Sequence, residues 1–270
     1  MPNQFTHSWT EKEIEFVRTN IGKLTYEKIG NFINRSYSSV QSKVRYLPFK
    51  KKVRKYSINS NFFKKWSPEM AYTAGFIAAD GNICHSGNAF ALQIASDDLD
   101  IMEKIRIAMS YGGPVHKKLR FNGKVSYSLR ICDQTIFTDL DKLGITERKS
   151  LTLSPKVQKS FIVDFLRGFF DGDGTVYIRN HKYPSKLAVI FYTASFPMAE
   201  FIYIKMQKLL GNLYNGNVQK RLTKGGTPYY SISLGHKASI KIYSIFYTNA
   251  TIYMDRKFKK FLQGIKHDNP

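Results

Sequence analysis

Apolar residues near the start of the chain recur at helical intervals in three short stretches. The first stretch follows Thr10 and Glu13, whose spacing is that of a capping box at the start of a helix. A second helix is expected over residues 26–33, and residues 34–36 form the turn before a third helix that begins at Ser38. The pattern therefore predicts a three-helix module that ends in a helix-turn-helix.

The third of these helices carries polar and basic side chains beside its apolar positions. Such side chains reach base edges and phosphates when a recognition helix enters a major groove. Through residues that include Trp9, Arg35 and Lys43, the module resembles the Myb-like domains often attached to mobile endonucleases. We expect residues 1–49 to be a DNA-binding domain, with a helical oligomerisation or protein-binding module as the alternative. Its candidate DNA contacts are Ser39, Gln41, Ser42, Lys43 and Arg45.

Residues 50–65 begin with a basic run and show neither a helical nor a strand period. We interpret them as a linker that can also lie along a phosphate backbone. The first 65 residues hold 14 Lys and Arg but only four Asp and Glu, a net charge of +10. This concentration of charge favours a separate DNA-contacting module at the N-terminus.

A helical pattern of ten residues occurs twice in the remainder of the chain. Residues 72–81, YTAGFIAADG, recur as residues 165–174, FLRGFFDGDG, at an offset of 93. Gly75 and Gly168 each have another small residue four positions later, on the same helix face. Small residues there allow two helix backbones to approach unusually closely. The chain is therefore an internal duplication whose two repeated helices are expected to pack together.

Each repeated helix ends in an aspartate followed by a glycine, at Asp80 and at Asp173. A helix C-terminus already carries about −0.5 charge, so two carboxylates on adjoining ends need a cation. Carboxylate oxygens combined with phosphate oxygens are the usual surroundings of Mg²⁺. The alternative is that each Asp-Gly pair only caps a helix and turns the chain. Its occurrence twice, in a strongly basic chain, favours the metal site.

The two copies resemble the motif that gives the LAGLIDADG homing endonucleases their name, over roughly residues 66–265. The resemblance implies an α+β fold in which two pseudo-symmetric αββαββα repeats, residues 66–155 and 156–270, form a DNA-binding saddle. It implies that Asp80 and Asp173 are catalytic metal ligands for Mg²⁺ or another divalent cation such as Mn²⁺. The backbone carbonyls of Ala79 and Gly172 are implied as further metal ligands.

This sequence departs from the family motif at Thr73 and Ala78 in the first copy and at Arg167 in the second. None of these differences removes an acid at a metal-binding position. They bear on helix packing more than on activity.

The duplication extends beyond the motif, because the same order of elements is predicted after each copy. In the first repeat we expect a strand at 90–95, a helix from 96 to 109, a hairpin of 115–119 and 125–131, and a helix at 134–143. In the second we expect a strand at 187–194, a helix at 195–210, a hairpin of 213–221 and 229–234, and a helix at 236–246.

Alternation in the predicted hairpin strands leaves one face of each sheet open. Two open faces related by the helix pair would form a basic surface on the DNA duplex. The candidate groove or phosphate contacts are Lys117, Arg130, Arg179, Lys220 and Arg221, each of which can also be an ordinary surface charge.

A lysine follows an arginine late in each repeat, at Lys149 and at Lys257. The family resemblance implies that both lysines are catalytic, near the scissile phosphate, where they stabilise negative charge. Solvated surface lysines are the alternative. Ser96 and Ser195 fall where the family often has a residue that organises water, although a helix N-cap explains them equally well.

The whole chain has a formal charge of +22, which suits a polyanionic partner and favours nucleic acid. No apolar run approaches the ~20 residues of a membrane helix and no signal peptide opens the chain, so we expect no membrane and a cytoplasmic or organellar location. Cys84 and Cys132 lack the spacing of a zinc site, and two lone cysteines do not predict a disulfide scaffold.

We therefore expect a monomeric, metal-dependent endonuclease that cuts both strands of a specific double-stranded DNA site. The alternatives are an intron RNA maturase, with intron RNA as its partner, or a DNA-binding regulator that does not cut. A structural chromatin protein is a weaker alternative, because it leaves the paired aspartates unexplained.

Overall fold

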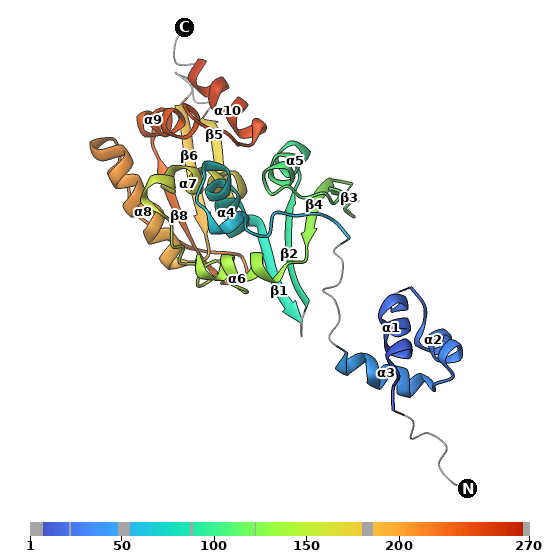
Figure 1. Ribbon diagram of the computed structural model, residues 1–270. Coiled ribbons are helices and arrows are strands. Elements are labelled where there is room, and N and C mark those ends of the chain that lie inside the picture. Colours follow the sequence, from blue (N-terminus) through green and yellow to red (C-terminus); the bar gives the residue numbers. More distant parts are fainter. Residues whose placement is uncertain are drawn as a thin grey trace. The chain divides into compact units, whose positions relative to one another are not determined.

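The computed structural model describes residues 8–21, 23–47, 55–86, 89–121, 123–179 and 186–266. The chain divides into two compact units, Met1–Lys55 and Tyr56–Pro270 (Figure 1).

The smaller unit is a three-helix bundle. Its helices are α1 (Glu11–Asn20), α2 (Tyr26–Ile33) and α3 (Tyr37–Tyr46). Thr10 and Glu13 form the predicted capping box, in which each side chain accepts a hydrogen bond from the other's backbone N–H. Helix α2 ends at Asn34, whose φ of 53° lies in the left-handed region. A small apolar core that includes Val17, Ile29 and Val40 holds the three helices together.

The larger unit contains two four-stranded antiparallel sheets with the strand orders β1-β2-β4-β3 and β5-β6-β8-β7. The α-helices are α4 (Pro68–Asp80), α5 (Leu99–Ala108), α6 (Gln134–Lys142), α7 (Ile162–Asp173), α8 (Phe196–Leu210), α9 (His236–Tyr247) and α10 (Asp255–Lys266). The strands are β1 (Gly81–Ser86), β2 (Ala89–Ser96), β3 (His116–Leu119), β4 (Val125–Ile131), β5 (Gly174–Arg179), β6 (Lys186–Thr193), β7 (Gln219–Leu222) and β8 (Pro228–Leu234). Short 3₁₀ turns lie at Phe62–Lys64, Lys159–Phe161 and Gly211–Leu213.

Helices α4 and α7 lie side by side between the two sheets (Figure 1). A Cβ atom on Gly75 would overlap the carbonyl oxygen of Phe165, and a Cβ on Gly168 would overlap the carbonyl oxygen of Tyr72. The same close approach therefore occurs twice, once from each helix. The predicted packing of the two repeated helices is confirmed, and only glycine fits at these two crossing positions.

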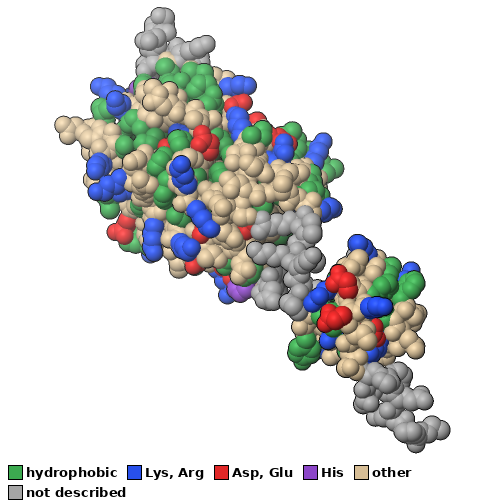
Figure 2. Space-filling view, viewed as in Figure 1, with side chains coloured by type: hydrophobic (Ala, Val, Ile, Leu, Met, Phe, Trp, Pro, Cys, Tyr) green, Lys and Arg blue, Asp and Glu red, His purple; other side chains and the backbone are tan. Residues whose placement is uncertain are grey.

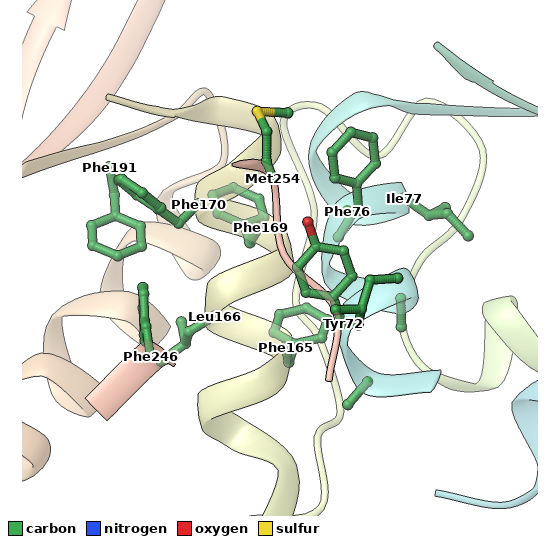
Figure 3. Close-up of a cluster of buried hydrophobic side chains, with 14 of the residues drawn as sticks. Tyr72, Phe76, Ile77, Phe165, Leu166, Phe169, Phe170, Phe191, Phe246 and Met254 are labelled. Atoms are coloured by element: carbon green, nitrogen blue, oxygen red, sulfur yellow. The ribbon is translucent and has the colours of Figure 1, made fainter. Parts of the chain in front are cut away.

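Apolar side chains surround the helix pair and fill the space beneath each sheet. Phe165, Phe169 and Phe170 of α7 extend this core toward Phe191 and Phe246 of the second repeat (Figure 3). Helices α5 and α6 pack on the first sheet, and α8, α9 and α10 pack on the second. Each sheet consequently has one helix-covered face.

The centre of this core also holds buried polar side chains, those of Tyr72, Asp171 and Arg167. The Tyr72 hydroxyl of α4 donates to Asp171 Oδ2 of α7 at 2.6 Å, so it joins the two repeats. Arg167, at a position where the family motif has alanine, is 1% exposed and donates to the carbonyl oxygens of Phe246 and Ile252. The arginine thereby ties α7 to the end of α9 without an unpaired buried charge.

The predicted helices and hairpins occur after each motif, with small shifts of their ends. The strands that directly follow the two motif helices, β1 and β5, were not predicted residue by residue. Helix α10 was not predicted either, although Phe258, Phe261 and Ile265 have helical spacing. The first strand of the second hairpin was predicted at 213–221, whereas β7 covers only Gln219–Leu222.

The predicted linker, residues 50–65, falls into two parts. Residues 50–54 lie outside the described residues. Residues 56–65 pack on the larger unit, where Phe62 and Phe63 are buried in its core and the Ser60 hydroxyl donates to Asp133 at 2.8 Å. This segment is part of the larger unit and is not a free tether. None of the described helices has the length and apolarity needed to cross a membrane.

The glycine crossing predicts a large effect of a small substitution. Gly75→Ala should lower the free energy of unfolding by about 3 kcal/mol or more, because the added methyl group forces the helix backbones apart. Chemical denaturation measures the change. Gly225→Ala is the matched control, since its Cβ would meet only Thr223 Oγ1 at 4.0 Å. Equal stability of the two variants would contradict the close crossing.

Candidate active site and DNA-facing surfaces

Asp80 and Asp173 are the last residues of α4 and α7, and the close crossing of these helices brings them together. A Cβ on Gly172 of α7 would lie 3.4 Å from Asp80 Oδ2, so the carboxylate of one repeat lies against the backbone of the other. Both aspartate side chains also reach solvent. The two predicted acids therefore share one accessible site at the paired helix ends.

The electrostatics of this pair favour a cation. Burial, and after it the negative charge of Asp80, raise the pKa of Asp173 to about 6 against the opposing effect of Lys149 and Lys257. Burial likewise raises the pKa of Asp80 above its ordinary value. Both carboxylates thus resist ionisation, and a divalent cation would relieve that cost.

The donor set at the helix ends fits a hard divalent cation. The described residues hold no cluster of three or more His, Cys, Asp or Glu side chains, so a cation would be held by two carboxylates with backbone and substrate oxygens. The carbonyls of Ala79 and Gly172 belong to the last turns of the two helices. They are not among the carbonyls that Lys149 and Lys257 contact.

Lys149 and Lys257 are both buried beside the helix ends. Lys257 Nζ donates to the carbonyl oxygens of Phe170, Asp171 and Gly174 at 2.5, 2.8 and 2.6 Å, and burial lowers its pKa to about 8. Lys149 Nζ donates to the carbonyl oxygen of Gly81, and burial also lowers its pKa. The lysines are therefore not solvated surface charges. They cap the C-terminal carbonyls of the motif helices while holding positive charge near the aspartates.

One lysine shares a cavity with an aspartate of the other repeat. Lys149 of the first repeat lines a cavity of about 350 Å³ together with Asp173 of the second repeat. Lys257 lines a separate cavity of about 460 Å³, which is formed by residues of the second repeat, and its charge lowers the pKa of Asp80. The half of the site that contains Lys149 thus combines residues from both repeats.

The two candidate water-organising serines are both buried and engaged in hydrogen bonds. Ser195 is the N-cap of α8, where its hydroxyl accepts from Met198 N and donates to the Leu153 carbonyl at 2.8 Å. Ser96 Oγ accepts from the backbone N–H of Asp98 at 3.2 Å. These contacts give both serines a structural role.

Strand register divides the five predicted contacts of the sheets between two faces. Residues paired across an antiparallel sheet point to the same side. Lys117 pairs with Tyr127 and Lys220 pairs with Tyr230, and both tyrosines pack on the core. Lys117 and Lys220 therefore point toward the helix-covered side, which corrects their expected place on the open face. Side chains alternate between the two faces along a strand, so a shift of one residue in the register with the partner strand moves a side chain to the opposite face.

The other three predicted sheet contacts, Arg130, Arg179 and Arg221, are exposed on the open faces. In the first sheet, Arg130 is in register with Gln93 and Asn82, which are also exposed. These two amides were missed by the sequence analysis, and the strict alternation of β2 could have found Gln93. The row combines the guanidinium and amide groups that read purine edges.

The open face of the second sheet has a different chemistry. Tyr177, Tyr192 and Tyr229 lie there beside Arg179 and Arg221. The Arg179 guanidinium lies 5.5 Å from the centre of the Tyr177 ring. The two open faces consequently differ, one being rich in amides and the other in tyrosines.

The candidate contacts of α3 are arranged along an accessible side of that helix. Ser42 and Arg45 are exposed, and Ser39 and Gln41 are half-buried. Lys43 Nζ lies 5.5 Å from the centre of the Trp9 ring. Lys43 therefore also contributes to the packing of its own unit. On the larger unit, Lys and Arg side chains are scattered over the visible face (Figure 2).

Comparison with known proteins supports the assignment of the fold. Residues 160–266, which span the second repeat, match the family model of the LAGLIDADG-like domain. The structure resembles that of the homing endonuclease I-WcaI bound to its DNA recognition sequence, with a TM-score of 0.50, 15% identity and coverage of 81% of this chain and 96% of that one. The structure of the meganuclease I-SmaMI bound to uncleavable DNA has a TM-score of 0.46 and 16% identity, with coverage of 75% of this chain and 88% of that one. No curated protein sequence matches the chain.

The raised pKa of Asp173 predicts a stability change without metal. The pKa of Asp173 is about 6 in the folded protein and about 3.8 in the unfolded chain. Its ionisation therefore does not affect the free energy of unfolding below about pH 3.8, and it lowers that free energy by the full amount above about pH 6. In metal-free buffer at pH 7, Asp173→Asn should stabilise the protein by about 1 kcal/mol, after discounting for solvent screening. The gain should vanish by pH 4. Thermal unfolding measures both, and a destabilised variant at pH 7 would refute this electrostatic picture.

Proposed function

We propose that this chain is a site-specific endonuclease that hydrolyses both strands of a double-stranded DNA target. The observation that carries the proposal is the glycine crossing of α4 and α7, which brings Asp80 and Asp173 together at an accessible site. The LAGLIDADG-like domain of the second repeat and the formal charge of +22 support it. We propose Mg²⁺ as the cation, with Mn²⁺ as a substitute, and a monomer as the active state.

In this proposal, Asp80 and Asp173 would hold the cation together with the carbonyls of Ala79 and Gly172. A divalent cation held there would act as a Lewis acid toward water and would offset negative charge on the leaving oxygen. Lys149 and Lys257 keep the helix ends rigid through their carbonyl contacts and add positive charge beside the phosphodiester. Ser96 and Ser195 act through the backbone geometry that they fix around the site.

The open faces of the two sheets are the proposed DNA-binding surface. Arg130, in register with Gln93 and Asn82, would read base edges in one half of the target. Arg179 and Arg221 would contact the other half, where neighbouring tyrosines offer apolar contact as well as hydroxyl groups. Lys117 and Lys220, at the sheet margins, are assigned to phosphates only.

We propose that the smaller unit is a Myb-like helix-turn-helix domain that adds contacts to the same DNA. Its three helices, the turn at Asn34 and the N-cap at Ser36 give α3 the setting of a recognition helix. Arg35 donates to Glu13 at 2.8 Å and lies 4.9 Å from the centre of the Trp9 ring, so it holds the bundle together. We assign the DNA contacts of this unit to residues of α3: Ser39, Gln41, Ser42, Lys43 and Arg45.

The first test is loss of cutting without loss of binding. Asp80→Asn and Asp173→Asn should each lower double-strand cleavage at least about 100-fold, since even supporting groups around a metal have effects of that size. The substrate is obtained by selecting the sequences that the wild-type protein cuts from a randomised duplex library with Mg²⁺. Affinity for the selected duplex, measured without divalent metal, should change little. Double-strand cutting by either variant at the wild-type rate would defeat the assignment.

The second test concerns the smaller unit. Replacing Arg45, which is exposed on α3, by glutamine should weaken binding to the selected duplex and reduce the salt dependence of the affinity by about one counterion. Fluorescence anisotropy over a range of salt concentrations measures both. Arg18→Gln, on α1, is the control for loss of one charge in the same unit. The proposal fails if the two variants bind equally well.

A further inference from the structure

Helix α5 of the first repeat and its N-cap residue are joined by ionic contacts to the first residues of α10 in the second repeat. Asp98 accepts three contacts from the Arg256 guanidinium, two from Nε and one from Nη2, at 3.0 to 3.1 Å. Lys104 Nζ donates to Asp255 Oδ1 at 2.5 Å and to the Tyr253 carbonyl at 2.8 Å. We call Asp98, Lys104, Asp255 and Arg256 the inter-repeat clamp.

The Asp98 carboxylate binds Arg256 of the clamp and does not cap its own helix. It is the N-cap residue of α5, yet its side chain caps no backbone N–H of that helix. In the second repeat, the N-cap residue of the corresponding helix α8, Ser195, does accept from Met198 N. An aspartate is a strong N-cap when it is free to act as one. Its carboxylate is instead engaged with an arginine that lies 158 residues later.

The clamp lies directly beside one lysine of the site. Lys257 follows Arg256 in the chain, and both residues line the cavity next to Gly172 and Gly174. Another carboxylate of α5, Asp100, accepts from the backbone N–H of Asp255 at 3.2 Å. The backbone that carries Lys257 is thereby fixed by the first repeat as well as by its own.

The segment that carries Lys149 is held across the repeats by different chemistry. There the Ser195 hydroxyl donates to the Leu153 carbonyl at 2.8 Å, four residues beyond the lysine. This contact joins neutral groups, whereas the clamp joins charges. The two lysines therefore depend on different positioning groups, and one can be disturbed while the other is kept.

We propose that the inter-repeat clamp positions Lys257 in its own half of the site, and so controls the cutting of one of the two DNA strands. The proposal rests on the endonuclease function proposed above. Charge-assisted, bidentate contacts fix geometry more tightly than neutral ones. A misplacement of about 1 Å in a reacting site can cost about 100-fold in rate. Loss of the clamp should slow one cut and leave the other.

Asp98→Asn is the main test variant, because it removes the charge partner of Arg256 and keeps the arginine. Glu103→Gln is the matched control, because Glu103 accepts from Arg106 of the same helix, α5, at 2.6 Å and its contact stays within the first repeat. The double variant Asp98→Arg with Arg256→Asp restores the ion pair in reverse. Lys149→Met and Lys257→Met provide the reference pattern for disturbance of each half of the site.

The cutting assay uses the selected duplex with a different label on each strand. Asp98→Asn should slow the cutting of one strand 10-fold to 100-fold. This should be the strand whose cutting is also slowed by Lys257→Met and is not slowed by Lys149→Met. Glu103→Gln should cut both strands as the wild type does, and the reversed pair should recover the slow cut. Equal slowing of both strands, or no slowing, would overturn the proposal. Failure of the reversed pair to recover would assign Arg256 to direct DNA contact and would also overturn it.

Hydrogen exchange in the full chain without DNA gives a second readout. In Asp98→Asn, the amides of residues 253–257 should exchange faster than in the wild type and in Glu103→Gln. The thermal stability of Asp98→Asn and of Glu103→Gln should be the same within experimental error. Unchanged exchange in this segment would overturn the clamp even if the wild-type protein cut no DNA. If the wild-type protein cuts no DNA but Asp98→Asn exchanges faster in this segment, the endonuclease function is refuted and the clamp remains as a structural contact between the repeats.

Discussion

The structure of the larger unit depends on the crossing of two helix backbones at Gly75 and Gly168. Each glycine faces a carbonyl oxygen of the opposite helix, at Phe165 and at Tyr72, at a separation that excludes even a methyl group. Helix ends that meet this closely bring two aspartates and two helix C-termini into one place. That concentration of negative charge is what the buried lysines, and the proposed cation, offset.

The electrostatic consequences of this crossing extend into the rest of the fold. Lys257 contacts three carbonyl oxygens around the end of α7, and Arg167 contacts two carbonyl oxygens around the end of α9. Both side chains are long cations whose stems are buried and whose donors are occupied. Buried cations of this kind stabilise only when every donor has a partner. The site is therefore built from groups that also hold the helix ends in place.

Much of the fold was predictable because its signals are local in the sequence. Thr10 and Glu13 lie three residues apart and specify the start of α1, and the duplicated motif identifies the helix pair. The pairing of Lys149 with Asp173 was not predictable, because it depends on how the second repeat folds over the first. The ion pair of Asp98 with Arg256 spans 158 residues and leaves no local pattern. Lys117 was placed on the wrong face because its register with Tyr127 is set by the partner strand.

The hydrogen bond between Tyr72 and Asp171 also bears on how the two repeats can change over evolutionary time. Tyr72 corresponds to Phe165 in the duplication, and Asp171 corresponds to Ala78. A symmetric dimer of the first repeat would bury two phenols without that acceptor, and one of the second would bury two carboxylates that keep the Met254 N–H but lack the phenol. Each phenol left without an acceptor costs about 1–3 kcal/mol. The two halves are therefore complementary at this position, and two identical halves would lack this bond.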